Sequence, residues 1–454
     1  MFSKILIANR GEIAVRIIRA CKEMGVATVA VFSEADRDAL HVSLADESVC
    51  IGPARVQDSY LNMPSILSAA VKTGAQAIHP GYGLLSENAR FAELCEKCHI
   101  HFIGPDAKLI SELGDKDAAK RTMREAGVPV VPGSEIVPDV EAAKKAAKEI
   151  GFPLLVKARA GGGGRGIRLV NTEAELEPAF LASSKEAEAA FGDGACYLEK
   201  YLDPVKHIEM QILCDNFDNV VCLGERECSI QRKHQKLLEE SPACCITPEM
   251  RARMMDAAAK AAHAVHYRSL GTIEFLVDSD RNFYFMEMNT RLQVEHPVTE
   301  FVTGLDLVKW QIRAAAGIEL PFHQEDIRLN GHAIECRINA EDPENHFMPS
   351  CGRISLLHIP GGPWVRFDTA LYQDYSVPPY YDSLLGKLIV HAPTREEAVR
   401  KMKAALAELV IEGVTHTADL QMISFPTLIF STAAIPPTLW KREGLNNDAE
   451  VRKL

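Results

Sequence analysis

The chain has 454 residues, 47% of them apolar, which is enough for about two to four domains with well-filled hydrophobic cores. A formal net charge of −12, with no basic stripe or arginine-rich tail, disfavours a nucleic-acid partner. Polar side chains interrupt the first residues and no run of about 18 apolar residues follows, so we expect a cytoplasmic protein without a membrane span.

Residues 4–110 alternate short apolar runs, such as KILIA and TVAVFS, with helical stretches. This alternation predicts a doubly wound parallel sheet wrapped by helices. The first strand-to-helix turn, Asn9 to Glu12, contains only Gly11 of the three glycines that a dinucleotide fingerprint requires. A nicotinamide enzyme is therefore disfavoured, and this part of the chain is predicted to be largely scaffold.

The twelve cysteines are scattered, mostly in apolar segments, so we expect reduced thiols and no disulfides. One local cluster, Cys95-Glu-Lys-Cys98-His99, has the spacing of a c-type haem attachment and, with His101, could also suggest zinc. Haem attachment needs export, and the surrounding stretch predicts an amphipathic helix with Ser86 near its cap. Structural cysteines are the favoured interpretation.

The stretch LLVKARAGGGGRGIRLV places a run of glycines between two strand-like segments, which predicts the loop of a β-hairpin. It is not a P-loop, because the G-x-x-x-x-G-K-[ST] spacing is absent. Residues without side chains still let backbone N–H groups approach a triphosphate and suit a closing lid, although a plain flexible hairpin is the alternative. Lys157 and Lys116 favour the phosphate interpretation.

A second hairpin is predicted in HIEMQILCDNFDNVVCLGERE, with Asp215 to Asn219 as its turn, followed by the polar run CSIQRKHQKLLEESP. The cations of that run, Arg232, Lys233 and Lys236, form either a solvated basic loop or an anion site, and we favour the anion site. No base partner for Cys228 is evident, so a packing role is expected for it.

Residues 271–297 carry the most informative pattern, because acids and amides interrupt strand-like sequence. Apolar residues alternate on both sides of the turn Asp278 to Asn282, which predicts two antiparallel strands. Glu274 and Glu287 would then face each other, a like-charge pair that destabilises a sheet unless a cation lies between them. Magnesium, which takes oxygen ligands, is the natural cation, with Asn289 as a third ligand.

Glu287, Asn289 and Arg291 share one face of the second predicted strand. If the chain stays extended, Gln293 and Glu295 continue that face. The alternative, a solvated polar strand face, is disfavoured because unpaired charge is costly in a core hairpin. The apolar residues that make it a core hairpin are Phe275, Val277, Phe283 and Phe285.

From about residue 330 the chain changes character, with strand-like GHAIECRINAED and GKLIVHAPT and the helical stretch TREEAVRKMKAALAELVI. We expect a separate α+β C-terminal domain. The chain is thus predicted to divide into residues 1–115, residues 116–330 with a lid at about 131–203, and residues 331–454.

These segments together resemble biotin carboxylase, the ATP-grasp component of biotin-dependent carboxylases, over nearly the whole chain. The resemblance is carried by ILIANRGEIA, HPGYGLLSEN, GDK, GGGGRG, ECSIQRKHQK, EMNTRLQVEHPVTE and ECRINAEDP. It implies a multidomain α/β and α+β fold with an ATP-grasp domain and a glycine-rich lid. Arg159 and Ala160, before the glycines, and the stretch from Thr415 depart from the family pattern.

The resemblance also implies which residues bind the nucleotide and the metal. Mg²⁺ or Mn²⁺ would be held by Glu274, Glu287 and Asn289. The residues that would hold ATP are Lys116, Lys157, Gly163, Gly164, Glu199, Lys200, Tyr201, Leu202, His207, Gln231, His234, Glu274 and Glu287.

The family reaction has two steps: bicarbonate attacks the γ-phosphate of ATP to give carboxyphosphate, whose breakdown carboxylates the ureido nitrogen of biotin. By resemblance, Lys236, Arg291 and the Gln293-Val294 region would bind bicarbonate. Glu295 would be its base, and Arg337 would stabilise the biotin enolate.

The biotin must arrive on a separate carrier protein, because no Ala-Met-Lys-Met sequence occurs in the chain. The expected partners are that carrier, a carboxyltransferase and a second copy of the chain, with acetyl-CoA carboxylase as the favoured complex. The sequence does not reveal the final carboxyl acceptor. Two alternatives remain: another ATP-grasp ligase with a different acceptor, and a non-enzymatic nucleotide sensor.

Overall fold

The computed structural model describes residues 1–159, 166–232 and 235–422. Two compact units are present. One contains Met1–Asp115, His207–Glu274 and the chain from Glu287, and the other contains Lys116–Lys206 and Phe275–Met286. Among the described residues, no helix combines the length and apolar character that a membrane crossing needs.

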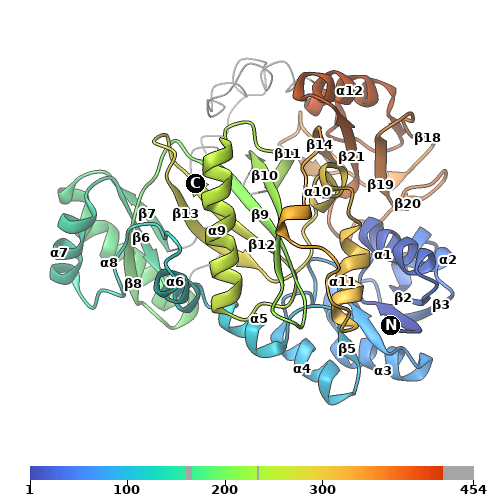
Figure 1. Cartoon of the computed structure of the whole chain (residues 1–454), viewed down its shortest axis with the longest axis horizontal. Helices are drawn as coiled ribbons and strands as arrows, with labels where there is room; N and C mark the ends of the chain where they lie inside the picture. The colour runs from blue at the N-terminus through green and yellow to red at the C-terminus, as the bar shows by residue number, and fades with distance from the viewer. Residues whose placement is uncertain (160–165, 233–234, 423–454) are drawn as a thin grey trace. The chain divides into compact units, whose positions relative to one another are not determined.

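The larger unit begins with a five-stranded sheet in the order β3-β2-β1-β4-β5, in which every pair is parallel (Figure 1). Ile5 and Ile7 of β1 belong to one core and Leu6 to another, so both faces of the sheet are covered and the predicted doubly wound sheet is confirmed. Its strands are β1 Lys4–Ile7, β2 Ala27–Ser33, β3 Glu47–Gly52, β4 Ala77–His79 and β5 His101–Phe102. Its helices are α1 Gly11–Glu23, α2 Leu40–Leu44, α3 Met63–Thr73, α4 Ala89–Lys97 and α5 Ala107–Gly114, with 3-10 turns η1 Glu34–Asp36 and η2 Val56–Asp58.

The cysteine pair Cys95 and Cys98 lies on helix α4 and at its C-cap. The helix is capped by Asn88 and not by Ser86, because the Asn88 side chain accepts a hydrogen bond from the backbone N–H of Phe91. Cys95 is buried and all twelve cysteines are free thiols. The amphipathic helix predicted around this motif is confirmed, with its start corrected.

The smaller unit is a three-stranded antiparallel sheet, β7-β6-β8, packed against helices. Lys157 of β6 pairs with Ile167 of β7, which confirms the predicted hairpin around the glycine run. Gly163 and Gly164 themselves lie outside the described residues. The elements are α6 Lys116–Glu125, α7 Val140–Ile150, β6 Leu154–Ala158, β7 Ile167–Val170, α8 Glu173–Phe191 and β8 Cys196–Lys200.

An eight-stranded sheet runs in the order β13-β12-β9-β10-β11-β14-β21-β19. The two predicted hairpins both belong to this sheet and are confirmed: Cys214 pairs with Val220, and the Asp278 N–H donates to the Asn282 carbonyl at 3.0 Å. The strands are β9 Lys206–Cys214, β10 Val220–Arg232, β11 Gln235–Ser241, β12 Ser269–Val277, β13 Phe283–Asn289, β14 His332–Asn339, β19 Val365–Thr369 and β21 Leu384–Ala392.

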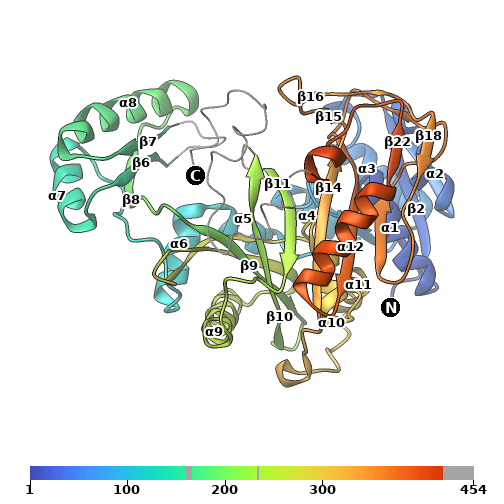
Figure 2. The ribbon, with the colours of Figure 1, turned by 90° about the horizontal axis from the view of Figure 1, so that it is seen from above.

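Helices cover both faces of this sheet. Arg226 of β10 bonds to Thr299 of α10, whereas its neighbour Glu225 bonds to Arg251 of α9, so α10 and α9 lie on opposite faces. Helix α12 packs along β14 and β21 (Figure 2). The helices are α9 Pro248–Ala264, α10 His296–Thr303, α11 Leu307–Ala315 and α12 Arg395–Glu408, with the 3-10 turn η3 Gln324–Asp326. Short strands complete the unit: β15 Glu341–Asp342, β16 Met348–Pro349, β17 Gly352–Arg353, β18 Leu356–His358, β20 Ser376–Val377 and β22 Val410–Glu412.

Two segments show strand pairing that the sequence analysis did not predict. In the polar run after Cys228, β10 continues to Arg232 and pairs with β11, where Gln231 lies opposite Lys236. Of the strands from residue 332 on, β14, β21 and β19 extend the large sheet, since β14 pairs with β11, with Glu335 opposite Glu239. In both places polar side chains fit a strand because partners on neighbouring strands bond to them.

Candidate active site

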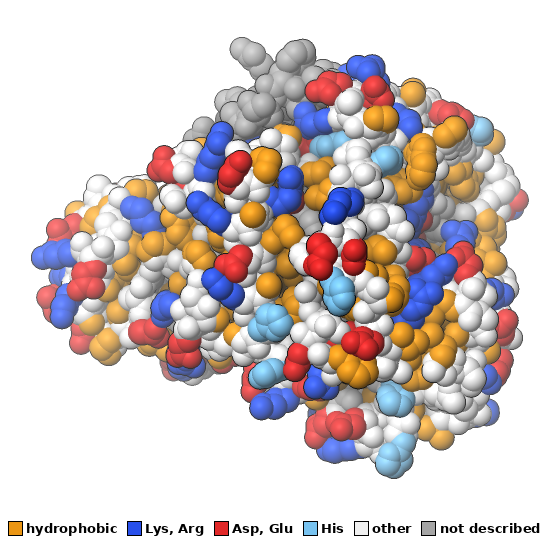
Figure 3. All heavy atoms as spheres, in the orientation of Figure 1, with side chains coloured by type: hydrophobic (Ala, Val, Ile, Leu, Met, Phe, Trp, Pro, Cys, Tyr) orange, Lys and Arg blue, Asp and Glu red, His pale blue; other side chains and the backbone are white. Residues whose placement is uncertain are grey.

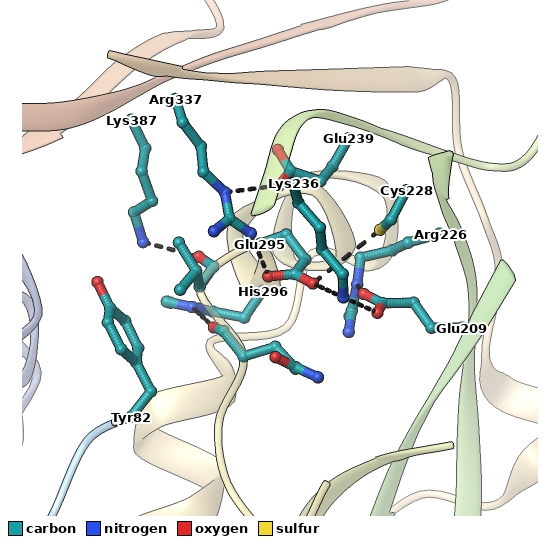
Figure 4. Close-up of polar contacts among 12 residues, drawn as sticks. Tyr82, Glu209, Arg226, Cys228, Lys236, Glu239, Glu295, His296, Arg337 and Lys387 are labelled. Carbon is teal, nitrogen blue, oxygen red and sulfur yellow. Dashed lines mark hydrogen bonds and ion pairs between the residues drawn. The ribbon is translucent and has the colours of Figure 1, made fainter. Parts of the chain in front are cut away.

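Lys236, on strand β11, lies among three carboxylates. Its Nζ is 2.6 Å from an oxygen of Glu209 and 2.6 Å from one of Glu295 (Figure 4). It also lies 3.2 Å from an oxygen of Glu274. The side chain is 12% exposed. Burial lowers the pKa of Lys236, but the surrounding carboxylates raise it well above its ordinary value. The predicted anion site therefore contains a permanently charged, nearly buried ammonium rather than a solvated basic loop.

Glu295, immediately before helix α10, accepts bonds from two cations on different strands. One oxygen accepts from Lys236, and the other accepts from Nη2 of Arg337 at 2.9 Å. Burial raises the pKa of this carboxyl, which is 1% exposed, but Lys236, Arg337 and Arg226 hold it well below its usual range. Glu295 is consequently an ionised carboxylate at neutral pH, the protonation state that a general base needs.

Arg337, on strand β14, joins Glu295 to a second acid. Its Nε donates to Glu239 at 2.6 Å. Burial raises the pKa of Glu239 to about 7, although Arg337 opposes that shift. Burial also raises the pKa of Glu335, the cross-strand neighbour of Glu239, well above its ordinary value. Within the described residues, neither carboxyl oxygen of Glu335 has a hydrogen-bond partner, so this acid is held neutral.

Three charged residues that the sequence did not single out complete this centre: Glu209, Arg226 and Glu239. Arg226, fully buried on β10, donates to Glu209 at 2.5 Å and to Gln211 at 2.6 Å. Cys228, two residues further along β10, has its Sγ 4.0 Å from a Glu295 oxygen, and burial raises its thiol pKa well above the ordinary value. It remains a thiol, as expected of a packing cysteine. The available signal was the alternation of polar residues in HIEMQIL and GERE, which places them on one strand face.

The predicted metal ligands lie on the neighbouring strands β12 and β13. Asn289 donates its amide N–H to Glu274 at 2.9 Å, and Nε2 of His207 lies 2.8 Å from the other Glu274 oxygen. Burial raises the pKa of Glu274, but Lys236 and His207 lower it to about 2. An ionised carboxylate beside an amide, with half-buried Glu287 two residues before Asn289, offers the oxygen donors that suit Mg²⁺.

The alternation of burial along β13 shifts by one residue within the strand. Phe283 and Phe285 are buried, Met286 and Glu287 are both half-buried, and Met288 is buried again. The expected core residues of the hairpin are confirmed as buried. The chain does not stay extended beyond Asn289, so the prediction of one continuous strand face out to Glu295 is wrong. Glu295 instead occupies the N-cap position of α10, which turns the chain.

The residues between β13 and α10 nevertheless gather around Glu274. Gln293 donates to Glu274 at 3.2 Å, and Arg291 donates to the side-chain oxygens of Gln293 at 2.8 Å and Asn289 at 3.0 Å. Arg291 also bonds to Glu87 at 2.7 Å, a partner more than two hundred residues away in the chain. The Val294 carbonyl accepts from the buried Lys387 at 2.9 Å. The predicted bicarbonate residues are thus brought together by folding.

In the smaller unit, Glu199 accepts short bonds from both Lys157 and Lys120. Burial raises the pKa of Glu199, but the two lysines lower it. Lys120, one helical turn after the predicted Lys116 on α6, was missed by the sequence reasoning. Lys116 itself is exposed.

The rest of the predicted nucleotide residues belong to two segments. Lys200, at the end of β8, donates to the carbonyls of Gly151 and Phe152 at 3.2 and 3.0 Å, and Tyr201 and Leu202 follow it half-buried. In the larger unit, Gln231 donates to Nδ1 of His207 at 3.1 Å. His234 and Lys233 lie outside the described residues.

Comparisons with known proteins connect this geometry to a family. Three family models match: the biotin carboxylase N-terminal domain over residues 1–110, the ATP-binding domain of the carbamoyl-phosphate synthase L chain over 115–323, and the biotin carboxylase C-terminal domain over 335–429. Biotin carboxylase 1 of Bacillus subtilis (strain 168) is 57% identical over 424 residues, covering 93% of this chain and 94% of its own length.

Two solved structures are similar throughout. A biotin carboxylase in complex with β,γ-ATP from Campylobacter jejuni is 53% identical with a TM-score of 0.88, covering 94% of this chain and 95% of that one. The biotin carboxylase domain dimer of Hydrogenobacter thermophilus 2-oxoglutarate carboxylase, solved with MgADP, ADP and bicarbonate, is 53% identical with a TM-score of 0.87, covering 94% of both chains. The chain belongs to the biotin carboxylase family.

Proposed function

We propose that Glu295, Lys236 and Arg337 form the reacting centre at which the chain catalyses the ATP- and bicarbonate-dependent carboxylation of biotin. The observation that carries this proposal is the position of Glu295, an ionised and almost fully buried carboxylate between two cations. A base that is already deprotonated and fixed in direction suits proton removal from bicarbonate. A mere nucleotide-binding protein has no need of such a group.

In the first step, Glu295 takes the bicarbonate proton while a bicarbonate oxygen attacks the γ-phosphorus of ATP, and the bond to the β-phosphate breaks to release ADP and form carboxyphosphate. Lys236 and Arg291 offset the negative charge of bicarbonate, and Gln293 and the Val294 backbone orient it. Glu274, Glu287 and Asn289 would hold Mg²⁺ or Mn²⁺, which neutralises charge on the phosphates. The protein's own contribution is positioning and electrostatic stabilisation.

In the second step, carboxyphosphate breaks down to CO₂ and phosphate, the phosphate takes the ureido proton of biotin, and Arg337 stabilises the resulting enolate while its nitrogen bonds to CO₂. The guanidinium is already fixed by Glu239 and Glu295, so little reorganisation is needed when negative charge develops nearby. Burial raises the pKa of Glu239 to about 7, which supports this role, because whenever this acid is protonated it leaves more of the positive charge of Arg337 for the substrate.

ATP itself is assigned to the residues that the resemblance named. Lys157 and Lys116 would neutralise phosphate oxygens, and Lys120 joins them through its shared partner Glu199. Gln231 donates to His207, and His207 in turn contacts Glu274. The resemblance alone supports a role in ATP binding for the remaining residues, which are Glu199, Lys200, Tyr201, Leu202, Gly163, Gly164 and His234.

The biotin is proposed to be carried by a separate biotinyl carrier protein, and the carboxyl group to be passed on by a carboxyltransferase partner. A homodimer is proposed by analogy with the Hydrogenobacter thermophilus domain dimer. Acetyl-CoA carboxylase is the favoured complex, and a 2-oxoglutarate carboxylase is the alternative that this relative suggests. A cytoplasmic location is proposed from the sequence. Copurification of the transferase partner identifies the acceptor.

The activity is tested by ADP release with ATP, Mg²⁺ and bicarbonate, with and without free biotin. Stimulation of ADP release by free biotin, together with formation of carboxybiotin, is the expected result. Another ATP-grasp ligase would release ADP only with a different acceptor, and a nucleotide sensor would bind ATP without turnover. Either of those outcomes contradicts the proposal.

A further inference from the structure

Two adjacent cysteines, Cys244 and Cys245, lie in the loop between β11 and α9. Cys244 is exposed and Cys245 is half-buried. Both approach the same oxygen of Glu227: Cys244 Sγ lies 3.8 Å and Cys245 Sγ 3.4 Å from Oε2. Cys244 Sγ also lies 4.0 Å from an oxygen of Glu240. Cys244 thus lies against both carboxylates, and Cys245 lies against Glu227.

The two carboxylates are direct cross-strand neighbours, since Glu227 of β10 pairs with Glu240 of β11. They are 7% and 6% exposed. Like charges opposite each other destabilise a sheet unless positive charge offsets them. Arg395 supplies positive charge and bonds to Glu240 at 2.7 Å, and a ring nitrogen of His332 also lies 2.7 Å from Glu240. Burial raises the pKa of Glu240, but these two partners lower it to about 2, so Glu240 is ionised.

This cluster lies on the sheet face opposite the candidate active site. Arg226 and Cys228 of β10 point toward Glu209 and Glu295. Glu225 points the other way and bonds to Arg251 of helix α9 at 2.7 Å. Because side chains alternate along a strand, Glu227 shares the face of Glu225. The reaction described above uses none of the residues of this cluster.

We propose that Cys244, Cys245, Glu227 and Glu240 bind a thiophilic divalent cation, with Zn²⁺ as the chemical type. In a tetrahedral zinc site, Zn–S bonds of about 2.3 Å and Zn–O bonds of about 2.1 Å put sulfur and oxygen ligands about 3.6 Å apart. The three sulfur–oxygen separations in the cluster, 3.4, 3.8 and 4.0 Å, bracket that value. The ligand atoms of Glu227, Glu240 and Cys244 all lie within 4.8 Å of one another.

The ligand chemistry separates this site from the magnesium ligands. Thiolates select zinc and cadmium, whereas Mg²⁺ takes oxygen ligands only. On binding, each thiol loses its proton to solvent and the thiolate forms the metal bond, so metal uptake releases protons. His332 and Arg395 would orient Glu240 as a ligand through the bonds they already make. The bound ion would fasten the loop before α9 to strands β10 and β11.

The test is titration of the reduced, metal-free full-length protein with Co²⁺ or Cd²⁺ in the presence of excess Mg²⁺. Thiolate-to-metal absorption reports sulfur ligands alone, so metal bound only by carboxylates gives no signal. We expect one metal per chain with this absorption in the wild type. The Cys244→Ser/Cys245→Ser variant should lose the band, and Glu227→Gln should weaken binding roughly tenfold or more.

Cys98→Ser and Cys351→Ser are the matched controls, because both cysteines are exposed and lie outside the cluster. They should keep the band at full intensity. Circular dichroism and ADP release show that each variant is folded. The proposal is overturned if the wild type shows no thiolate band, or if the band survives in the double serine variant. It is overturned equally if folded Glu227→Gln binds the metal as tightly as the wild type.

Discussion

Two charged clusters are proposed to act on substrates, and they are built differently. Next to the large sheet, at the start of α10, Glu295 is 1% exposed and is bonded by cations from two different strands, Lys236 and Arg337. In the smaller unit, Lys120 and Lys157 converge on one carboxylate, and their side chains are 17% and 23% exposed. The first arrangement fixes the protonation and direction of a base. The second keeps lysines that can exchange a carboxylate partner for an incoming phosphate.

Charged side chains on the surface are arranged differently from those in the two clusters. On the face drawn in Figure 3, acidic and basic side chains are interspersed among apolar ones. Exposed pairs such as Lys97–Glu93 are worth little individually, because water and salt screen them. The charges that matter for the chemistry are the buried ones, where the loss of one partner leaves the other unpaired.

Removing the base should have the largest effect on activity. Glu295→Gln keeps the size and hydrogen-bonding shape of the side chain but cannot accept the bicarbonate proton. We expect bicarbonate-dependent ADP release to fall about 10²- to 10⁴-fold. The measurement is the ADP release rate at saturating ATP and bicarbonate, with ATP affinity measured separately. An unchanged rate in a folded variant would remove Glu295 from the reaction.

Arg337→Ala removes the guanidinium that is proposed to stabilise the biotin enolate in the second step. Carboxybiotin formation should fall about 10²- to 10³-fold, while ATP affinity stays close to the wild-type value. Arg337→Lys keeps the charge but loses the two-pronged geometry, so it should be intermediate. Equal losses of carboxybiotin formation and nucleotide affinity would contradict the assignment. Arg353→Ala, at an exposed site, is the control and should be neutral.

Glu239 should make the free energy of unfolding depend on pH, because burial raises its pKa from 4.5 to about 7. The folded state then binds more protons than the unfolded state between these pH values, so this stabilisation is present below about pH 4.5 and is lost as pH rises through 7. Glu239→Gln removes this dependence. The difference in unfolding free energy between about pH 5 and pH 8 should shrink by up to about 3 kcal/mol.

Urea unfolding at the two pH values measures that difference. Comparing the two pH values within each protein cancels the pH-independent cost of the substitution. Glu335 titrates in the same direction, so part of the pH dependence should survive in Glu239→Gln. A variant with the full wild-type dependence would show that Glu239 is not the group that carries this proton.

The lysine pair should give the smallest effect. Lys157→Ala leaves Lys120 on Glu199, so we expect the KM for ATP to rise roughly tenfold with a smaller change in kcat. Lys120→Ala should behave similarly, and the double variant should lose more than either. A change in kcat alone, with KM unaltered, would argue that the pair acts on the reaction and not on nucleotide binding.

Much of this arrangement was predictable because it is local. The glycine hairpin, the hairpin closed at Asp278 and the parallel N-terminal sheet follow from alternation and turn residues within short windows. The strand at Gln231 and Lys236 was missed because its charges are paired by acids elsewhere in the chain. Lys236 bonds to Glu295, which is 59 residues away.

The protonation states of the buried acids could not be predicted from the sequence either, because they also depend on contacts between segments that are far apart in the chain. Glu239 and Glu335 are ordinary acids in the sequence, and only the pairing of β11 with β14 buries them side by side. The bond from Arg337 to Glu239 spans 98 residues. The sequence analysis predicted from strand alternation that Glu274 and Glu287 face each other. This stays a prediction, because the alternation of buried and half-buried residues along β13 is interrupted at Met286 and Glu287.

The most direct test of the central claim is the infrared difference spectrum of wild type against Glu295→Gln at about pH 6, where an unperturbed glutamate is already ionised but a desolvated one is not. If Glu295 is ionised in the folded protein, the substitution removes a carboxylate band and leaves the protonated-carboxyl region unchanged. Loss of a protonated-carboxyl band instead would mean that Glu295 is neutral in the folded protein, and that Lys236 and Arg337 do not hold it ready as a base.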